Sequence, residues 1–194
     1  DRGFEISRAL IVFTTLFVAS LIIFEVGAVY TWPGQVAFVP SLFLLPPQFV
    51  PLVVAAALIC GKLMRGPTTG LPPPRALMAL GDSWFAVGPA LVLVAAGAPA
   101  ATDVALGILL LALLAQFAGE TVSSRVRESL HGGASLREQL IESAWIYSVD
   151  ALLSCIGFAL ALACEIEPAA ALLVLPLFAV IAFLARDRRR RISS

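Results

Sequence analysis

The sequence predicts an all-α fold, a polytopic transmembrane helical bundle with six full spans plus a proline-broken half-helix, with seven spans as the alternative. Hydrophobic residues make up 60% of the 194 positions and charged residues only 13%, half of the ~25% that is usual in soluble domains. With a mean hydropathy of +0.96, the chain has too few polar side chains to cover a globule in water. This composition excludes a soluble enzyme domain, a nucleic-acid-binding protein and a disordered regulator.

A helix needs roughly 20 apolar residues to cross the hydrocarbon core, and the first three apolar segments differ in length. Residues 9–30 are long enough for one span. Residues 35–47 are apolar but too short, and Pro40 and Pro46 interrupt helical hydrogen bonding. We expect residues 35–47 to form a half-helix that the protein shields from lipid. If they cross instead, the chain has seven spans. Residues 48–64 form the next span.

The second half of the chain contains four longer apolar segments, which we expect to be the remaining spans: residues 77–97, 103–123, 135–164 and 168–185. We expect the second of these helices to continue out of the membrane to about Leu130. Ser135 and Glu138 have the spacing of a capping box, which starts a helix. Pro168 suits the first turn of the last span.

The chain divides into two parts at the end of the last span. Residues 1–185 form the predicted transmembrane helical domain. No Gly or Pro follows Pro176, so we expect residues 186–194 to continue the last helix as the start of a cytoplasmic linker to an output domain that these residues do not include.

Basic residues are concentrated on one side of the membrane if the later spans alternate. Eleven of the 13 Lys and Arg residues fall on that side: Lys62, Arg65, Arg75, Arg125, Arg127, Arg137, Arg186, Arg188, Arg189, Arg190 and Arg191. The opposite loops contain Asp103, Glu165 and Glu167 and no base. Because basic loops stay in the cytoplasm, we expect a cytoplasmic C-terminus. Six spans place the N-terminus inside, and seven place it outside.

Ionisable groups inside the predicted spans are candidate functional residues, since such a group costs at least ~2.5 kcal/mol at mid-membrane. All of them are acids, and we expect no basic partner deep in a span: Glu25, Asp82, Glu120 and Asp150. The structural alternative is that Asp82 hydrogen-bonds neighbouring hydroxyls and that Glu120 reaches Arg125 or Arg127 at the interface.

Polar side chains recur at helical spacing on three consecutive predicted spans. One stripe contains Ser143, Tyr147, Asp150 and Ser154, at spacings of four, three and four. Lipid cannot solvate such faces, so we expect them to converge on one interior cavity. The predicted lining residues are Asp82, Ser83, Gln116, Glu120, Tyr147, Asp150 and Ser154. A small amphipathic or cationic ligand, or protons and water, would occupy this cavity.

No catalytic motif is present in the sequence. It has no phosphate-binding glycine loop, no HExxH and no CxxC. His131 is the single histidine, and the three cysteines are widely spaced in apolar runs, which is typical of packing residues rather than of metal ligands. We therefore expect no enzyme activity from these residues, no metal and no cofactor.

Four segments resemble a known group of membrane domains. These are GDSWFAVGPALVLV, AQFAGETVSSRVRE, ESAWIYSVDALLSCIG and LPLFAVIAFLARDRRRRIS. They resemble the N-terminal membrane (sensor) domains of actinobacterial cyclic-di-GMP signalling proteins, whose cytoplasmic ends are HD-GYP phosphodiesterase or GGDEF cyclase domains. The resemblance covers roughly residue 36 to the end. It implies an input role in signal transduction and a multi-pass location in the bacterial cytoplasmic (inner) membrane. Because such output domains work in pairs, it also implies a homodimer.

Two functions follow as hypotheses. The first is a membrane-embedded sensory domain that couples a ligand or the state of the membrane to a cytoplasmic signalling output, with lipids and an unknown small ligand as partners. The second is a small transporter or substrate-capture subunit, because a proline-broken half-helix and midplane acids are typical of transport sites. We see no internal repeat, which weighs against a standard inverted-repeat transporter.

Overall fold

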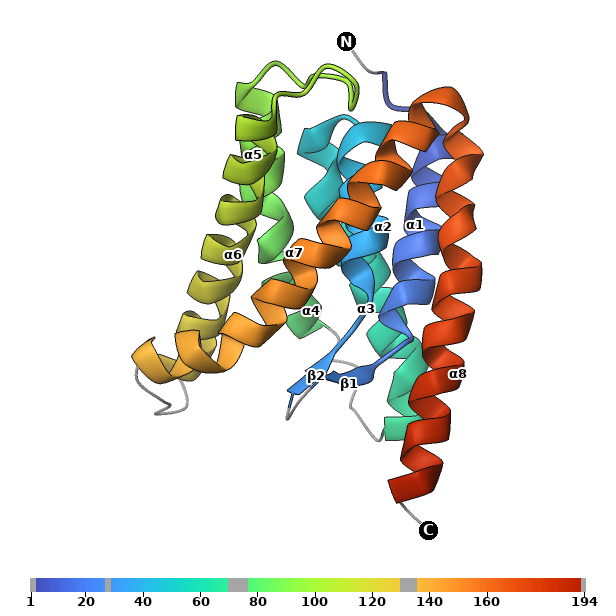
Figure 1. The fold of residues 1–194 in the computed structure, drawn as a ribbon, viewed down its shortest axis with the longest axis vertical. Coiled ribbons are helices and arrows are strands. Elements are labelled where there is room, and N and C mark those ends of the chain that lie inside the picture. Colours follow the sequence, from blue (N-terminus) through green and yellow to red (C-terminus); the bar gives the residue numbers. More distant parts are fainter. Residues whose placement is uncertain (1–2, 27–28, 70–76, 130–135, 193–194) are drawn as a thin grey trace.

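The computed structural model describes residues 3–26, 29–69, 77–129 and 136–192, which form a bundle of helices (Figure 1). The α-helices in this part of the chain are α1 (Ile6–Ser20), α2 (Gly34–Leu44), α3 (Val50–Thr69), α4 (Ala79–Asp82), α5 (Val87–Ala95), α6 (Leu106–Ser129), α7 (Leu136–Ile166) and α8 (Val174–Ile192). The shorter elements are the strands β1 (Phe24–Val26) and β2 (Val29–Thr31) and the 3-10 helices η1 (Pro47–Phe49), η3 (Trp84–Ala86) and η4 (Pro168–Leu173).

The first predicted span is wrong in its second half. Helix α1 ends at Ser20, and the chain then forms an antiparallel hairpin in which Glu25 is paired with Tyr30. Five of the six strand residues are β-branched or aromatic, which favours strands. A continuous apolar run does not by itself separate helix from strand. Glu25 therefore lies in a hairpin and not inside a helical span.

Helix α2 is the half-helix expected from residues 35–47. All of its 11 residues are buried, and it packs against α7 and α1 near the middle of the bundle (Figure 1). At a rise of 1.5 Å per residue it is about 16 Å long, roughly half of the hydrocarbon thickness. The protein therefore shields a segment that is too short to cross, and that contains Pro40, from lipid.

Four helical segments among the described residues are long and apolar enough to cross a membrane: Pro47–Gly66, Leu106–Val126, Ala144–Ile166 and Pro168–Asp187. The predicted six full spans are therefore not confirmed. The span predicted at residues 77–97 is divided into α4, η3 and α5. At the division the hydroxyl of Ser83 donates to the carbonyl of Leu80 at 2.8 Å, and such local bonds compete with regular helix.

The later helices follow the sequence more closely. Helix α6 runs unbroken to Ser129, as expected, and α7 ends at Ile166. The capping box at Ser135 lies outside the described residues. Element η4 begins at Pro168, the position expected for a first turn. Helix α8 continues without a break through the basic run to Ile192.

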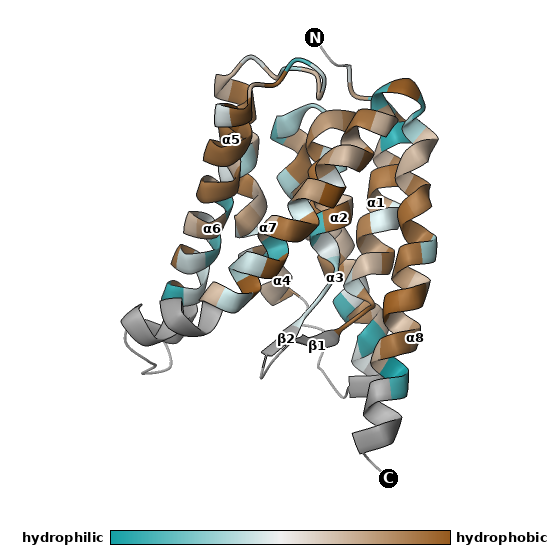
Figure 2. Ribbon diagram, in the orientation of Figure 1, coloured by the Kyte–Doolittle hydropathy of each residue, from teal (hydrophilic) through white to brown (hydrophobic). Residues whose placement is uncertain are grey.

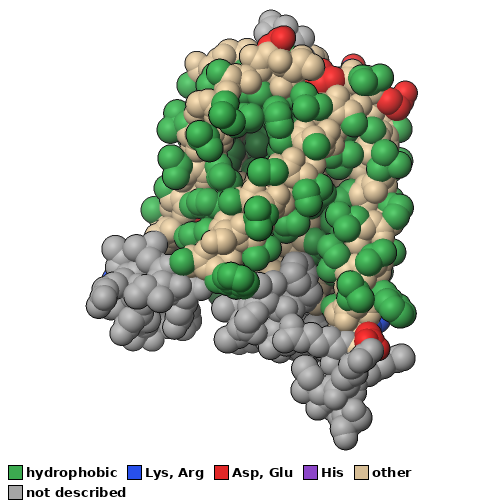
Figure 3. Space-filling model, viewed as in Figure 1, with side chains coloured by type: hydrophobic (Ala, Val, Ile, Leu, Met, Phe, Trp, Pro, Cys, Tyr) green, Lys and Arg blue, Asp and Glu red, His purple; other side chains and the backbone are tan. Residues whose placement is uncertain are grey.

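The surface of the bundle is apolar over its middle. Figures 2 and 3 show hydrophobic residues along the outward faces of the helices, with acidic side chains at the end of the bundle where α7 meets η4. Large apolar side chains such as Leu152 and Phe183 are each 70% exposed. In water such a surface would aggregate, so it is consistent with a membrane protein.

The two termini lie at opposite ends of the bundle (Figure 1). The start of α1 is at the end that carries η4, and the end of α8 is at the other. An odd number of passes separates the termini in this way. The number of passes through the bundle is odd because α2 adds one, although α2 is too short to cross a membrane by itself.

Candidate functional site

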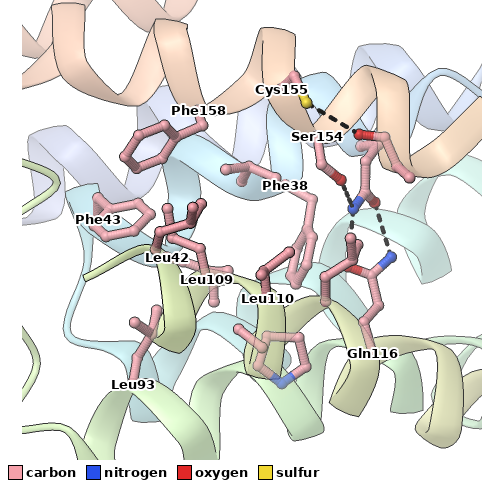
Figure 4. Close-up of a pocket in the computed structure, with 17 residues that line it drawn as sticks. Phe38, Leu42, Phe43, Leu93, Leu109, Leu110, Gln116, Ser154, Cys155 and Phe158 are labelled. Carbon is pink, nitrogen blue, oxygen red and sulfur yellow. Dashed lines mark hydrogen bonds between the residues drawn. The ribbon is translucent and has the colours of Figure 1, made fainter. Parts of the chain in front are cut away.

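A hydrogen-bonded cluster joins three helices inside the bundle (Figure 4). The side-chain nitrogen of Gln35 on α2 donates to the amide oxygen of Gln116 on α6 at 2.8 Å and to the hydroxyl of Ser154 on α7 at 2.7 Å. Gln116 returns a bond to the amide oxygen of Gln35 at 3.0 Å. Gln35 is 5% exposed and Gln116 4%. The two buried amides thus hydrogen-bond to each other, as buried polar groups usually do, and this uses one of the two N–H groups of Gln116.

This cluster forms one end of a cavity of about 250 Å³ between α2, α5, α6 and α7. Most of the wall is aromatic or aliphatic: Phe38, Leu42, Phe43, Leu93, Leu109, Leu110 and Phe158. The rings of Phe43 and Phe158 meet edge to face, 5.8 Å apart. Figure 3 shows a hollow on the face where α6 and α7 diverge, so the cavity opens toward the apolar surface. We call it the amide-ended cavity.

A second cavity, of about 280 Å³, contains charged side chains. Lys62 and Arg65 of α3, Asp82 of α4 and Glu120 of α6 line it. The Lys62 ammonium forms an ion pair with the Asp82 carboxylate, and both side chains are 27% exposed. We call it the charged cavity. Glu120 follows Gln116 by four residues on the same face of α6, so the two cavities lie at successive levels along that helix.

The predicted site residues are therefore distributed over more than one cavity. Gln116 and Ser154 line the amide-ended cavity, and Asp82 and Glu120 line the charged one. Ser83 is buried and bonded to the backbone of its own segment.

The remaining two residues lie between helices α6 and α7. The hydroxyl of Tyr147 is 2.9 Å from that of Thr121, and its ring stacks on Phe117 with centroids 4.5 Å apart. Asp150 is half-buried, and its carboxylate is close enough to Glu120 for the two negative charges to repel. The seven residues therefore do not line one cavity, as the sequence analysis expected. Their role in ligand binding stays a prediction.

Two residues of these cavities were missed by sequence reasoning. Gln35 was considered only as the first residue of the expected half-helix, although it is the single side-chain amide in residues 35–47. Lys62 was placed with the cytoplasmic charges, and the expectation that the acids have no basic partner is wrong for Asp82. Its pairing with Lys62 joins two helices and leaves no local spacing signal.

Comparisons with known proteins add no identification. The chain matches no protein-family model, no curated protein and no solved structure.

Proposed function

We propose that the chain is a membrane-embedded sensory domain that binds a small molecule and passes the change to a cytoplasmic output. The observation that carries this proposal is the amide-ended cavity, which opens to the apolar surface and has hydrogen-bonding groups prepared at its inner end. Concave, mainly apolar sites with a few convergent polar groups are typical of small-molecule binding.

The cavity wall and the C-terminal helix belong to consecutive elements of the chain. Helix α7 supplies Ser154 to the cavity, and η4 joins α7 directly to α8. The carboxylate of Glu165, near the end of α7, accepts a bond from the Ala101 backbone at 2.7 Å. Helix α8 packs against α1, η4 and β1. A shift of α7 on ligand binding would therefore move α8 as a body, and shifts of 1–2 Å are typical of switching helices.

The resemblance of four segments to cyclic-di-GMP signalling proteins supports an input role. On that reading the domain works as a homodimer in a bacterial inner membrane, with α8 leading into the cytoplasm. The helical continuation of α8 through the basic run to Ile192 suits a linker to an output domain. Mass measurement in nanodiscs tests the assembly, and a single copy in every mild detergent and in nanodiscs would contradict it.

A cavity-filling variant tests the coupling directly. We expect Ala151→Phe, which adds a ring to the α7 wall, to imitate an occupied cavity. Spin labels at Met64 on α3 and Arg186 on α8, measured by electron paramagnetic resonance in nanodiscs, should then report a distance change of about 1–2 Å. Ala95→Phe adds the same ring at an exposed position of α5 and should leave the distance unchanged. Equal distances in all three proteins would contradict the proposal.

One observation favours the alternative of a transporter or substrate-capture subunit. The amide-ended and charged cavities lie at successive levels of α6, at Gln116 and Glu120, and a transported molecule needs such a series of sites. The two functions differ in whether the protein moves a substrate across the membrane. A transporter moves its substrate across proteoliposomes that contain this protein alone, and a sensory domain does not.

A further inference from the structure

The lining of the amide-ended cavity limits the charge of its ligand. None of the described residues that line it is Asp, Glu, Lys, Arg or His. An ion in this apolar space would lose its water without gaining a counter-charge, which is strongly unfavourable. An uncharged molecule meets no such penalty. The lining therefore selects neutral molecules, unlike the charged cavity beside it.

The amide cluster retains unused hydrogen-bonding capacity. A glutamine amide has two N–H donors, and Gln116 uses one of them, toward Gln35. Within the described part of the chain its second N–H has no partner. Gln35, in contrast, uses its nitrogen for both Gln116 and Ser154. A buried donor without an acceptor is costly, so a ligand that brings an acceptor oxygen to Gln116 is favoured.

The opening of the cavity determines the route of entry. Leu110 and Leu106 on α6 and Cys155 on α7 line the cavity and are also exposed on the apolar surface. A molecule dissolved in the membrane meets this opening directly. The volume of about 250 Å³ lies just below the ~300–1,000 Å³ of common small-molecule pockets. It suits a small molecule or the end of a longer one whose chain remains in lipid.

We infer that the amide-ended cavity binds a neutral, membrane-soluble molecule whose carbonyl oxygen accepts the free N–H of Gln116. This inference rests on the proposed function and specifies its ligand class. Carboxylates and amines are excluded because the lining offers no counter-charge to an ion. Pure hydrocarbons of the same length as the ligand are disfavoured because they offer no acceptor to Gln116. The carbonyl adds one hydrogen bond to the apolar contacts that a hydrocarbon also makes.

A matched series of amphiphiles tests the ligand class in the full chain in nanodiscs. A neutral ketone carrying a photoreactive diazirine is cross-linked to the protein, and mass spectrometry locates the labelled peptides. We expect labels on α6 and α7 around Leu110 and Cys155. Unlabelled 2-undecanone should compete about five- to tenfold better than undecane at equal membrane concentration, the value of one hydrogen bond. Undecanoate and undecylamine should compete no better than undecane.

Two variants connect the result to the cavity. Gln116→Leu removes the donor and should abolish the preference for ketone over undecane. Gln48→Leu, the same change at an exposed position in η1, should retain it. If Gln116→Leu does not fold, Leu110→Trp provides the second test, because it narrows the opening from an exposed position and should lower labelling severalfold.

The outcomes separate the two proposals. Competition by the carboxylate or the amine as strong as that by the ketone would overturn the neutral ligand class and leave a ligand-binding sensory domain standing. An unchanged ketone preference in a folded Gln116→Leu protein would also overturn it. Labelling spread over the lipid-facing surface, with none in the cavity, would overturn both the ligand class and the proposed function.

Discussion

At the scale of single residues, the ion pair between Lys62 and Asp82 joins α3 to α4. Because both side chains are three-quarters buried, each is partly removed from water and depends on the other for its electrostatic stabilisation. Lys62→Met should lower stability by about 1–3 kcal/mol, between the values for surface and buried pairs. Thermal unfolding in detergent micelles, followed by circular dichroism, measures the change.

The double variant Lys62→Met/Asp82→Asn serves as the control for this prediction. It removes both charges, so it should be more stable than Lys62→Met alone, which leaves the Asp82 carboxylate without its lysine. Additive effects of the two single substitutions would show that the pair contributes no coupling energy.

At the scale of elements, α5 and α6 approach each other closely at Gly88. A Cβ atom added there would overlap the backbone carbonyl of Ala115, whereas a Cβ added at Gly107, an exposed position of α6, meets nothing within 4 Å. Small residues allow such close helix contacts in membranes. Gly88→Ala should therefore force the helices apart and cost about 1–3 kcal/mol, the range for overpacked cores. The unfolding temperature in detergent measures it.

Gly107→Ala is the matched control on the same helix pair. It should leave stability unchanged or raise it by up to about 1 kcal/mol, because alanine favours helix over glycine. Equal destabilisation by both substitutions would contradict the close contact of α5 with α6 and point instead to a general intolerance of these helices to change.

At the scale of the whole molecule, the separation of the termini predicts the membrane topology. The start of α1 and the end of α8 lie at opposite ends of the bundle (Figure 1). Single cysteines at Gly3, just before α1, and at Arg186, in the last part of α8, should therefore react with a membrane-impermeant maleimide from opposite sides. The background replaces Cys60, Cys155 and Cys164 by alanine. Intact cells and inverted vesicles supply the two sides. Labelling of both positions from one side would contradict the placement of these two ends on opposite sides of the membrane.

The positive-inside rule adds a direction to this prediction. The ends of α3, α6 and α8 that carry Lys62, Arg125 and Arg186 point to the same end of the bundle (Figure 1). We therefore expect the cysteine at position 186 to react in inverted vesicles and the cysteine at position 3 to react in intact cells.

Long-range contacts explain why the candidate site was predicted only in part. Gln116 and Ser154 stand out because each is a polar residue on the inward face of an apolar helix, a pattern of period 3.6 that is visible in sequence. Gln35 reaches them from a position 81 and 119 residues away along the chain. Nothing local indicates such a partner, so the amide-ended cavity was not foreseen.

Composition and the lengths of the apolar segments were enough to predict a helical protein with apolar spans and the positions of its later helices. Apolar length predicts α6, α7 and α8 because a helix that satisfies its own backbone hydrogen bonds depends mainly on local residues. The three-dimensional packing was needed to show that Phe24–Val26 pairs with Val29–Thr31 and that Asp82 pairs with Lys62. It was also needed to show that Gln116 and Ser154 line one cavity and that Asp82 and Glu120 line another. Those outcomes depend on which faces of distant helices meet, and packing of residues far apart in the chain sets that choice.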